Sequence, residues 1–284
     1  MAAITDLSDS INRLTGGNSG TPESLFFHKV PRVSGAVATA PIAGRAASLW
    51  TYDGYPAGGA VPTSAAIPTL STQGSLPFTA PGGSREKFML SAGIAPNVGG
   101  VFLLYDRLFH IGGLSGSLNT AQTVQGTTPT PALTRNTGGV GNFAFYEIYT
   151  IIGTTAATLT MTYTDQDGNT GQTSTINIGA TGFREVTRAQ RIPLAAGDSG
   201  LRAVASVQLS GASGTGTAGN FGITIAQPIA WIPIGTGGAG GWRDYTTGLP
   251  GIPSINPDAC LSLLFIPSTG TAPELWGAAT FIEK

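Results

Sequence analysis

The sequence predicts a mostly β protein, a β-sandwich or jelly-roll-like domain preceded by a short N-terminal helical arm. Glycine (42) and proline (19) together exceed a fifth of the 284 residues. Inside a helix they cost about 1 and 3 kcal/mol respectively, so long helices are excluded. Short alternating segments recur along the second half of the chain, and a hydrophobic content of 41% is sufficient for a core. Together these features favour about eight to ten short strands joined by turns.

The N-terminus carries the one convincing helix pattern. Leu7, Ile11 and Leu14 are spaced i, i+4 and i+7, and Thr5 or Asp6 can cap the first turn. At about ten residues such a helix is too short to be stable alone. Its apolar stripe therefore needs a surface, either on this chain or on a neighbour.

A chain of this length can form one large domain or two small ones. We divide it into an arm, residues 1–24, and a β domain, residues 25–284. Within the β domain, residues 25–100 are rich in Pro and Gly and are expected to drape over a surface, whereas residues 101–284 form the main strand-rich sandwich. The six prolines between positions 31 and 77 exclude central strands from that stretch.

Two hairpins are predicted. Segments 158–164 and 172–178 alternate on either side of an Asp-Gly turn, which is a strong hairpin signal. Segments 201–209 and 221–225 are expected to form the second hairpin across a Gly/Ser/Thr loop. The other predicted strands are 101–111, 143–151, 229–232, 261–266 and 275–282.

Charge is scarce on this chain. Charged residues make up 10%, against about 25% in ordinary soluble domains. Charge opposes association, so a charge-poor surface suits a protein that is packed against partners. The net charge is −1 and the arginines are scattered, so we expect no nucleic-acid partner. No apolar stretch approaches 18 residues, so we expect no membrane span.

Sequence motifs for catalysis and metal binding are incomplete. Ser199 lies in Gly-Asp-Ser-Gly, but a serine nucleophile needs a histidine base and a carboxylate, and the two histidines, His28 and His110, stand in unrelated contexts. Residues 235–240 match G-x-G-x-x-G, yet no helix pattern follows to hold a pyrophosphate. Residues 165–169 resemble the start of a calcium loop without its later glycine and glutamate. We expect no enzyme activity, no cofactor and no metal site.

Interface candidates are apolar side chains placed on the arm or in Gly-rich loops. Exposed Trp and Tyr commonly anchor protein interfaces, although buried loop plugs are the alternative reading. Single Cys260 lies in an apolar run and is expected to be a buried, inert thiol. The candidates are Leu7, Ile11, Leu14, Trp50, Tyr52, Tyr55, Trp242 and Tyr245.

Four segments carry a resemblance to a known class of proteins. They are residues 106–124, 146–149, 163–168 and 197–207, and they resemble predicted structural proteins of tailed phages. The likeness covers less than half of the chain and rests on turns and strands. It implies a non-catalytic virion component on a β fold, and it assigns no functional residue.

The expected function is therefore that of a virion structural protein, a capsid decoration or stabilising protein. Its expected partners are copies of itself, with a trimer preferred, and the major capsid or tail protein. Much of the contact is expected from residues 41–80. The N-terminus lacks a secretory signal pattern, so we expect synthesis in the host cytoplasm and residence in the virion. The alternatives are a tail component, a receptor- or carbohydrate-binding adhesin module using Trp50, Tyr52 and Trp242, and a hydrolase using Ser199.

The absence of a complete catalytic set yields a first prediction. Ser199→Ala should change the free energy of unfolding by only a few tenths of a kcal/mol, as at an ordinary turn position. Urea denaturation measures that change, and a fluorophosphonate probe tests reactivity. Labelling of Ser199 by the probe would contradict the expectation.

Overall fold

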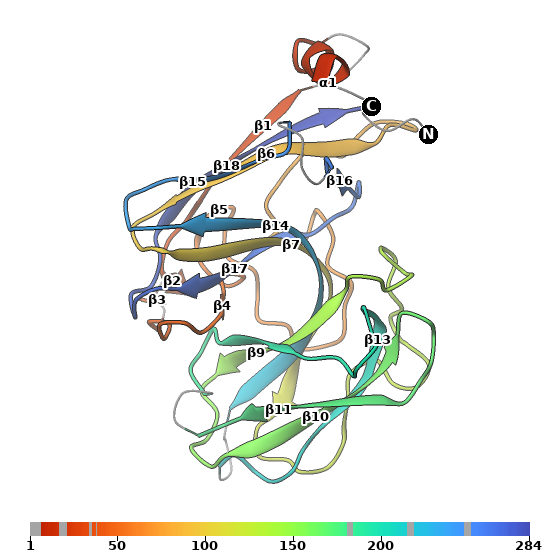
Figure 1. The fold of residues 1–284 in the computed structure, drawn as a ribbon. Coiled ribbons are helices and arrows are strands. Elements are labelled where there is room, and N and C mark those ends of the chain that lie inside the picture. Colours follow the sequence, from red (N-terminus) through yellow and green to blue (C-terminus); the bar gives the residue numbers. More distant parts are fainter. Residues whose placement is uncertain are drawn as a thin grey trace.

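The computed structural model describes residues 7–16, 22–33, 36–37, 39–180, 184–214, 219–246 and 251–284. The chain is mostly β, with one helix, α1 (Leu7–Leu14), in the described part, as predicted. Figure 1 shows an upper and a lower half joined at a waist, with α1 at the upper end.

Three antiparallel sheets build the molecule. The terminal sheet contains, in order, β15 (Gly241–Asp244), β6 (Lys87–Pro96), β18 (Leu275–Glu283), β1 (Glu23–Lys29) and β5 (Gly54–Tyr55), with β16 (Ser254–Ile255) paired to β6. The shared sheet contains β12 (Ala189–Ile192), β9 (Phe143–Thr150), β14 (Asn220–Ile234), β7 (Gly100–Ser115), β17 (Leu261–Pro267) and β4 (Ala47–Ser48). The hairpin sheet contains β11 (Gln172–Ile178), β10 (Ala157–Asp165), β13 (Leu201–Leu209) and β8 (Gln122–Thr123); β2 (Arg32–Val33) and β3 (Ala36–Val37) pair separately.

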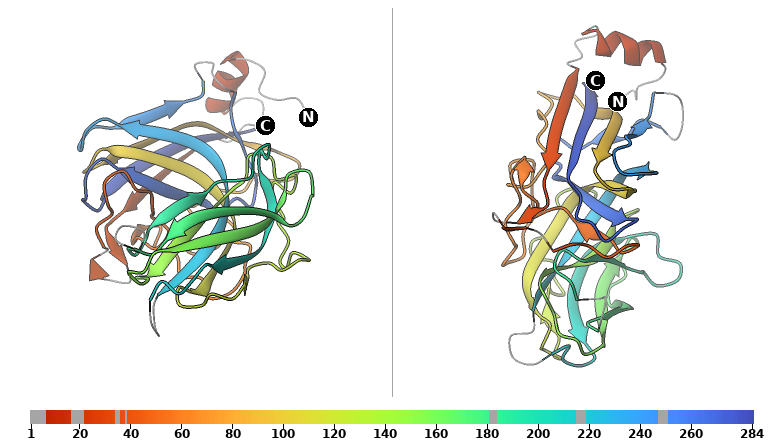
Figure 2. Two further views of the ribbon diagram at one scale, coloured as in Figure 1. Left: turned by 60° about the horizontal axis from the view of Figure 1, so that its bottom comes forward. Right: turned by 90° about the vertical axis from the view of Figure 1, so that its left-hand side faces the viewer.

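The shared sheet takes part in two sandwiches. Its long strands β7 and β14 pair from Asn220↔Ser115 to Ile234↔Gly100 and run through both halves of the molecule (Figures 1 and 2). In the upper half, side chains such as Phe102 and Ile232 pack against the terminal sheet. In the lower half, side chains from the same two strands pack against the hairpin sheet. The predicted sandwich is thus present twice, with one sheet common to both.

A buried charged cluster occupies the waist, on β7 and β9. The guanidinium of Arg107 is fully buried and donates from Nη2 to Glu147 Oε2 at 2.7 Å and to the hydroxyl of Tyr149 at 3.1 Å. Its Nε donates to His110 Nδ1 at 3.0 Å, and the ring of Trp50 covers it at 4.5 Å. These contacts offset the cost of burying the guanidinium, because a buried charge without partners is strongly destabilising.

The first predicted hairpin, whose two segments alternate most regularly, is confirmed. Segments 158–164 and 172–178 form the β10–β11 hairpin, and Asp165 accepts hydrogen bonds from the backbone N–H groups of Asp167 and Asn169 in its turn. Cys260 is fully buried, as predicted.

The second predicted hairpin is wrong. β13 pairs with β10 and β8 in the hairpin sheet, whereas β14 pairs with β7 and β9 in the shared sheet. The intervening chain therefore crosses between two layers. The separate strand predicted at 229–232 is also wrong, because these residues continue β14 beyond a bulge.

The draped segment is shorter than predicted. β6, inside residues 25–100, is a central strand between β15 and β18, and β1 pairs with β18 along its whole length. β1 begins at Glu23, within the region assigned to the arm. Residues 41–80 do cross the surface with only two-residue strands. Five of their large apolar side chains are buried in this chain's own core, namely Leu49, Trp50, Tyr52, Leu76 and Phe78, whereas Tyr55 is exposed.

The waist cluster predicts acid sensitivity. Burial, and then repulsion from Arg107, lowers the pKa of His110 to about 3, below the value of about 6.5 in an unfolded chain. Between these values the unfolded chain binds the extra proton, so the free energy of unfolding falls as the pH falls through that range. At pH 4.5 the loss from this residue should be about 2–3 kcal/mol.

Urea unfolding at pH 7 and pH 4.5 measures the effect. His110→Gln keeps a hydrogen-bond acceptor for Arg107 and does not titrate, so its stability should depend less on pH. Equal pH dependence in the wild type and this variant would contradict the assignment.

Candidate interaction surfaces

The outer face of the terminal sheet carries large exposed aromatic side chains. Strand alternation turns Leu25 and Phe27 of β1 into the core and Phe26 outward. The same alternation exposes Trp276 on β18 and Trp242 on β15, and Tyr55 extends the face from β5. The exposed fractions are 69% for Phe26, 62% for Tyr55, 59% for Trp242 and 64% for Trp276. We call this surface the aromatic face.

Sheet register places these side chains in two neighbouring rows. The first row crosses the sheet as Phe26, Ala278, Gly93 and Trp242. The second row, two residues further along the strands, is Tyr55, His28, Trp276 and Ala95. Small residues thus separate large aromatic ones.

A hollow of about 490 Å³ lies among these aromatic side chains. Its floor is formed by Gly93, Ala95, Gly277 and Ala278, and Trp242 lies directly over Gly93. A Cβ atom on Gly93 would sit 1.7 Å from Cε3 of Trp242, so only glycine permits this placement of the indole.

His28 supports the second row. Its imidazole stacks on Trp276 with ring centroids 3.8 Å apart and an interplanar angle of 6°. Its Nε2 also lies 3.3 Å from Glu274 Oε1. The stack fixes the indole of Trp276 on the aromatic face.

A polar row borders the aromatic rows on the same face. Sheet register aligns Ser24, Thr280, Ser91 and Asp244 across the sheet. Within the described chain, the three hydroxyl groups make no hydrogen bond. Asp244 Oδ1 accepts from the backbone N–H and the hydroxyl of Thr246, which leaves Oδ2 available. The aromatic face therefore has an apolar part and a hydrogen-bonding part.

A second apolar surface lies at the waist, on the face of the shared sheet that points away from the terminal sheet. We call it the waist groove; its volume is about 320 Å³. Register aligns Trp231 with Leu103 and Leu264, and Pro233 with Val101 and Ile266. Trp231 is 52% exposed. Arg191 lines one end, with its guanidinium 5.6 Å from the ring centroid of Phe143.

The helix α1 contacts its own chain through its polar side. Ser10 and Arg13 are buried, and Arg13 donates to the Glu283 carbonyl at 3.0 Å and to Asp9 at 2.9 Å. Ile11 and Leu14 of the apolar stripe are exposed. The side chain of Leu7 lies outside the described residues.

The loop aromatics divide into two groups. Tyr55 and Trp242 are exposed on the aromatic face. Trp50, Tyr52 and Tyr245 are buried, as in the alternative prediction that loop aromatics fill the core. Trp50 fits because Gly59 and Gly74 leave room for its indole, whose Nε1 donates to the Ala60 carbonyl. Trp50 and Tyr52 therefore cannot stack on an external sugar.

Sequence reasoning missed Phe26, Trp231 and Trp276. The available signal was alternation: each is a large aromatic residue at an outward position of a strand whose neighbours in sequence face the core.

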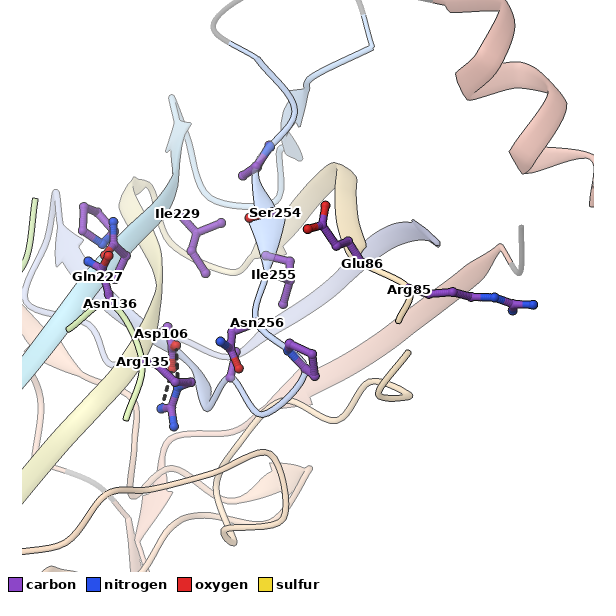
Figure 3. A pocket seen from close by; sticks show the side chains of 14 residues that line it. Arg85, Glu86, Asp106, Arg135, Asn136, Gln227, Ile229, Ser254, Ile255 and Asn256 are labelled. Carbon is purple, nitrogen blue, oxygen red and sulfur yellow. Dashed lines mark hydrogen bonds and ion pairs between the residues drawn. The ribbon is translucent and has the colours of Figure 1, made fainter. Parts of the chain in front are cut away.

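Another cavity, lined by charged and polar side chains, holds paired groups (Figure 3). It has a volume of about 420 Å³ and lies beside β6, β14 and β16. Asp106 accepts hydrogen bonds from Nε and Nη2 of Arg135, each at 2.9 Å, and from the Cys260 N–H at 2.8 Å. The carboxylate thus joins β7 to two loops, which is a structural role.

No cluster of metal-ligating side chains occurs among the described residues. In the same part of the chain, no helix is long and apolar enough to cross a membrane.

The fit of Trp242 over Gly93 is testable. Gly93→Ala should displace the indole and open the hollow, because the new methyl group would overlap the ring. Acrylamide quenching of tryptophan fluorescence should increase. Gly82→Ala is the control, since nothing lies within 4 Å of that position. Equal quenching in both variants would show that Trp242 does not rest on Gly93.

Comparisons with known proteins give no family. No family model and no curated protein matches the chain. Solved structures similar to it include the infectious bursal disease virus VP2 subviral particle, at 9% identity over 92% of this chain and 80% of that one, with a TM-score of 0.17. Another is the T=1 particle derived from infectious bursal virus, at 9% identity over 92% and 77%, with a TM-score of 0.16. Likeness at this level carries no argument about function.

Proposed function

We propose that this chain is a structural protein of a tailed-phage virion, a capsid decoration or stabilising protein that acts through protein contacts without catalysis. The proposal rests on the chemistry of its surface and on the resemblance of its strand and turn segments to tailed-phage structural proteins.

The main support for the proposal is the apolar composition of the waist groove. All six residues of its two aligned rows are apolar, and they lie on an outward face of a sheet, where a free monomer would place polar residues. Contiguous exposed apolar patches usually mark an interface. The indole of Trp231, more than half exposed beside buried Leu103 and Leu264, has the character of an interface anchor.

The helix stripe supports the same conclusion. α1 is fixed to its own chain by Arg13, yet Ile11 and Leu14 face solvent. A helix oriented in this way offers its apolar side to another chain. Copies of this chain and a major capsid protein are the proposed partners.

A head shell presents many equivalent sites to such a protein, which favours decoration over a tail role. Symmetric association hides the same patch on every copy, and a trimer matches the three-fold positions of an icosahedral shell. Copy number per purified particle separates the alternatives: hundreds of copies fit decoration or a tail tube, and about a dozen or fewer fit a vertex or baseplate.

Light scattering at micromolar concentration tests association directly. The wild type should exceed the 28.8 kDa of one chain. Trp231→Asp should shift it toward the monomer, because association would then have to remove a carboxylate from water. The control is Val140→Asp, since Val140 is 63% exposed and lies outside the groove. A wild type that is monomeric, alone and with capsid protein, would refute the proposal.

A further inference from the structure

We infer that the aromatic face binds an uncharged polysaccharide, so that the protein carries a glycan-binding site separate from the waist groove. The inference goes beyond the proposed structural function, and it depends on the juxtaposition of two exposed aromatic rows with a row of free hydroxyl groups on one rigid sheet.

The apolar part of the face suits a sugar ring. Trp242 lies over Gly93 with its ring across the sheet surface, and the ring of Trp276 is fixed by its stack on His28. The C–H groups on one face of a pyranose carry partial positive charge and are attracted to the negative face of an aromatic ring. Both indoles are held before a ligand arrives, so little conformational entropy is lost on binding.

The length of the face suits a chain of sugars. Phe26 and Trp242 occupy opposite ends of the first row and are separated by three strand-to-strand steps. At about 4.8 Å a step, the row spans about 14 Å, which exceeds a single pyranose ring. The Gly and Ala floor keeps the path between the aromatic side chains low and open.

The polar row supplies the hydrogen bonds that a sugar requires. Ser91, between Thr280 and Asp244, is buried. Ser24 and Thr280 carry solvent-accessible hydroxyl groups without a partner in the described chain, and Asp244 has a free carboxylate oxygen. An apolar protein partner covering this face would bury those groups unsatisfied, at about 1–3 kcal/mol each. A sugar ring pairs its hydroxyl edge with them and its C–H face with the indoles.

The local charge selects an uncharged glycan. Carboxylates of Asp244 and Glu274 border the face, and none of the residues that form the hollow is basic. Acidic polysaccharides would be repelled. The waist groove differs in chemistry, since its aligned rows contain no hydroxyl group.

Affinity electrophoresis of the full chain tests the inference. Native gels contain dextran, mannan, xylan or galactan, with dextran sulfate as the anionic counterpart. At least one neutral polysaccharide should retard the wild type, and dextran sulfate should not. Trp242→Ala and Trp276→Ala should each weaken binding at least about tenfold, and Thr280→Val several-fold.

Trp231→Ala is the matched control, because it removes a similarly exposed tryptophan from the waist groove and should leave retardation unchanged. Melting curves confirm folding, and Phe26→Ala replaces any tryptophan variant that does not fold. The inference would be overturned by any of three results. No neutral polysaccharide retards the wild type, dextran sulfate retards it more than the neutral polysaccharides do, or Trp231→Ala loses as much retardation as the variants of the aromatic face. Self-association measured by light scattering is independent of these outcomes, so the proposed structural function is judged separately.

Discussion

The continuous pairing of β7 with β14 is the constraint on which the rest of the structure depends. These two strands supply side chains to both cores, so neither sandwich can form without the other's central strands. Register shifts at Phe221/Ile223, Ile225/Ala226 and Pro228/Ala230 bend the pair and allow two separate sheets to pack against one. The Arg107 cluster lies at this bend and ties β7 to β9 through Glu147. An error in register here would misplace a buried charge as well as two apolar cores.

Burial of charged side chains explains much of the low charge of the surface. Eleven of the 29 charged residues are buried in the described part of the chain, and several of these form ion pairs, such as Arg107 with Glu147 and Arg135 with Asp106. The outer faces are therefore even poorer in charge than the composition implies. Buried pairs add little net stability, because desolvation offsets their attraction, but each is costly to break. Charged side chains in these buried pairs are not available to hydrate the surface.

The two exposed surfaces have different chemistry because they lie on different sheets. The terminal sheet joins both ends of the chain, and its outer face mixes aromatic side chains with hydroxyl groups. The shared sheet leaves a wholly apolar pair of rows at the waist. In the two proposals, protein is contacted on one sheet face and a hydrated polymer on another. Both proposals concern sheet faces, whose geometry is fixed by the ladders beneath them, and neither requires a moving loop.

Composition and alternation were sufficient to determine the β class, most of the long strands of the second half, the β10–β11 hairpin and the buried state of Cys260, because these depend on local propensity and on a period of two. The tertiary structure decided the rest. β1 and β18 are about 250 residues apart, and no local pattern encodes their pairing, yet this pairing brings Phe26 and Trp276 to one face. Loop aromatics could not be sorted by sequence either: Trp50 is buried because Gly59 and Gly74 from distant turns make room for it, whereas Trp242 is exposed because Gly93 holds it on an outer face. Burial of a side chain depends on what the rest of the chain places around it, and that is a property of long-range packing.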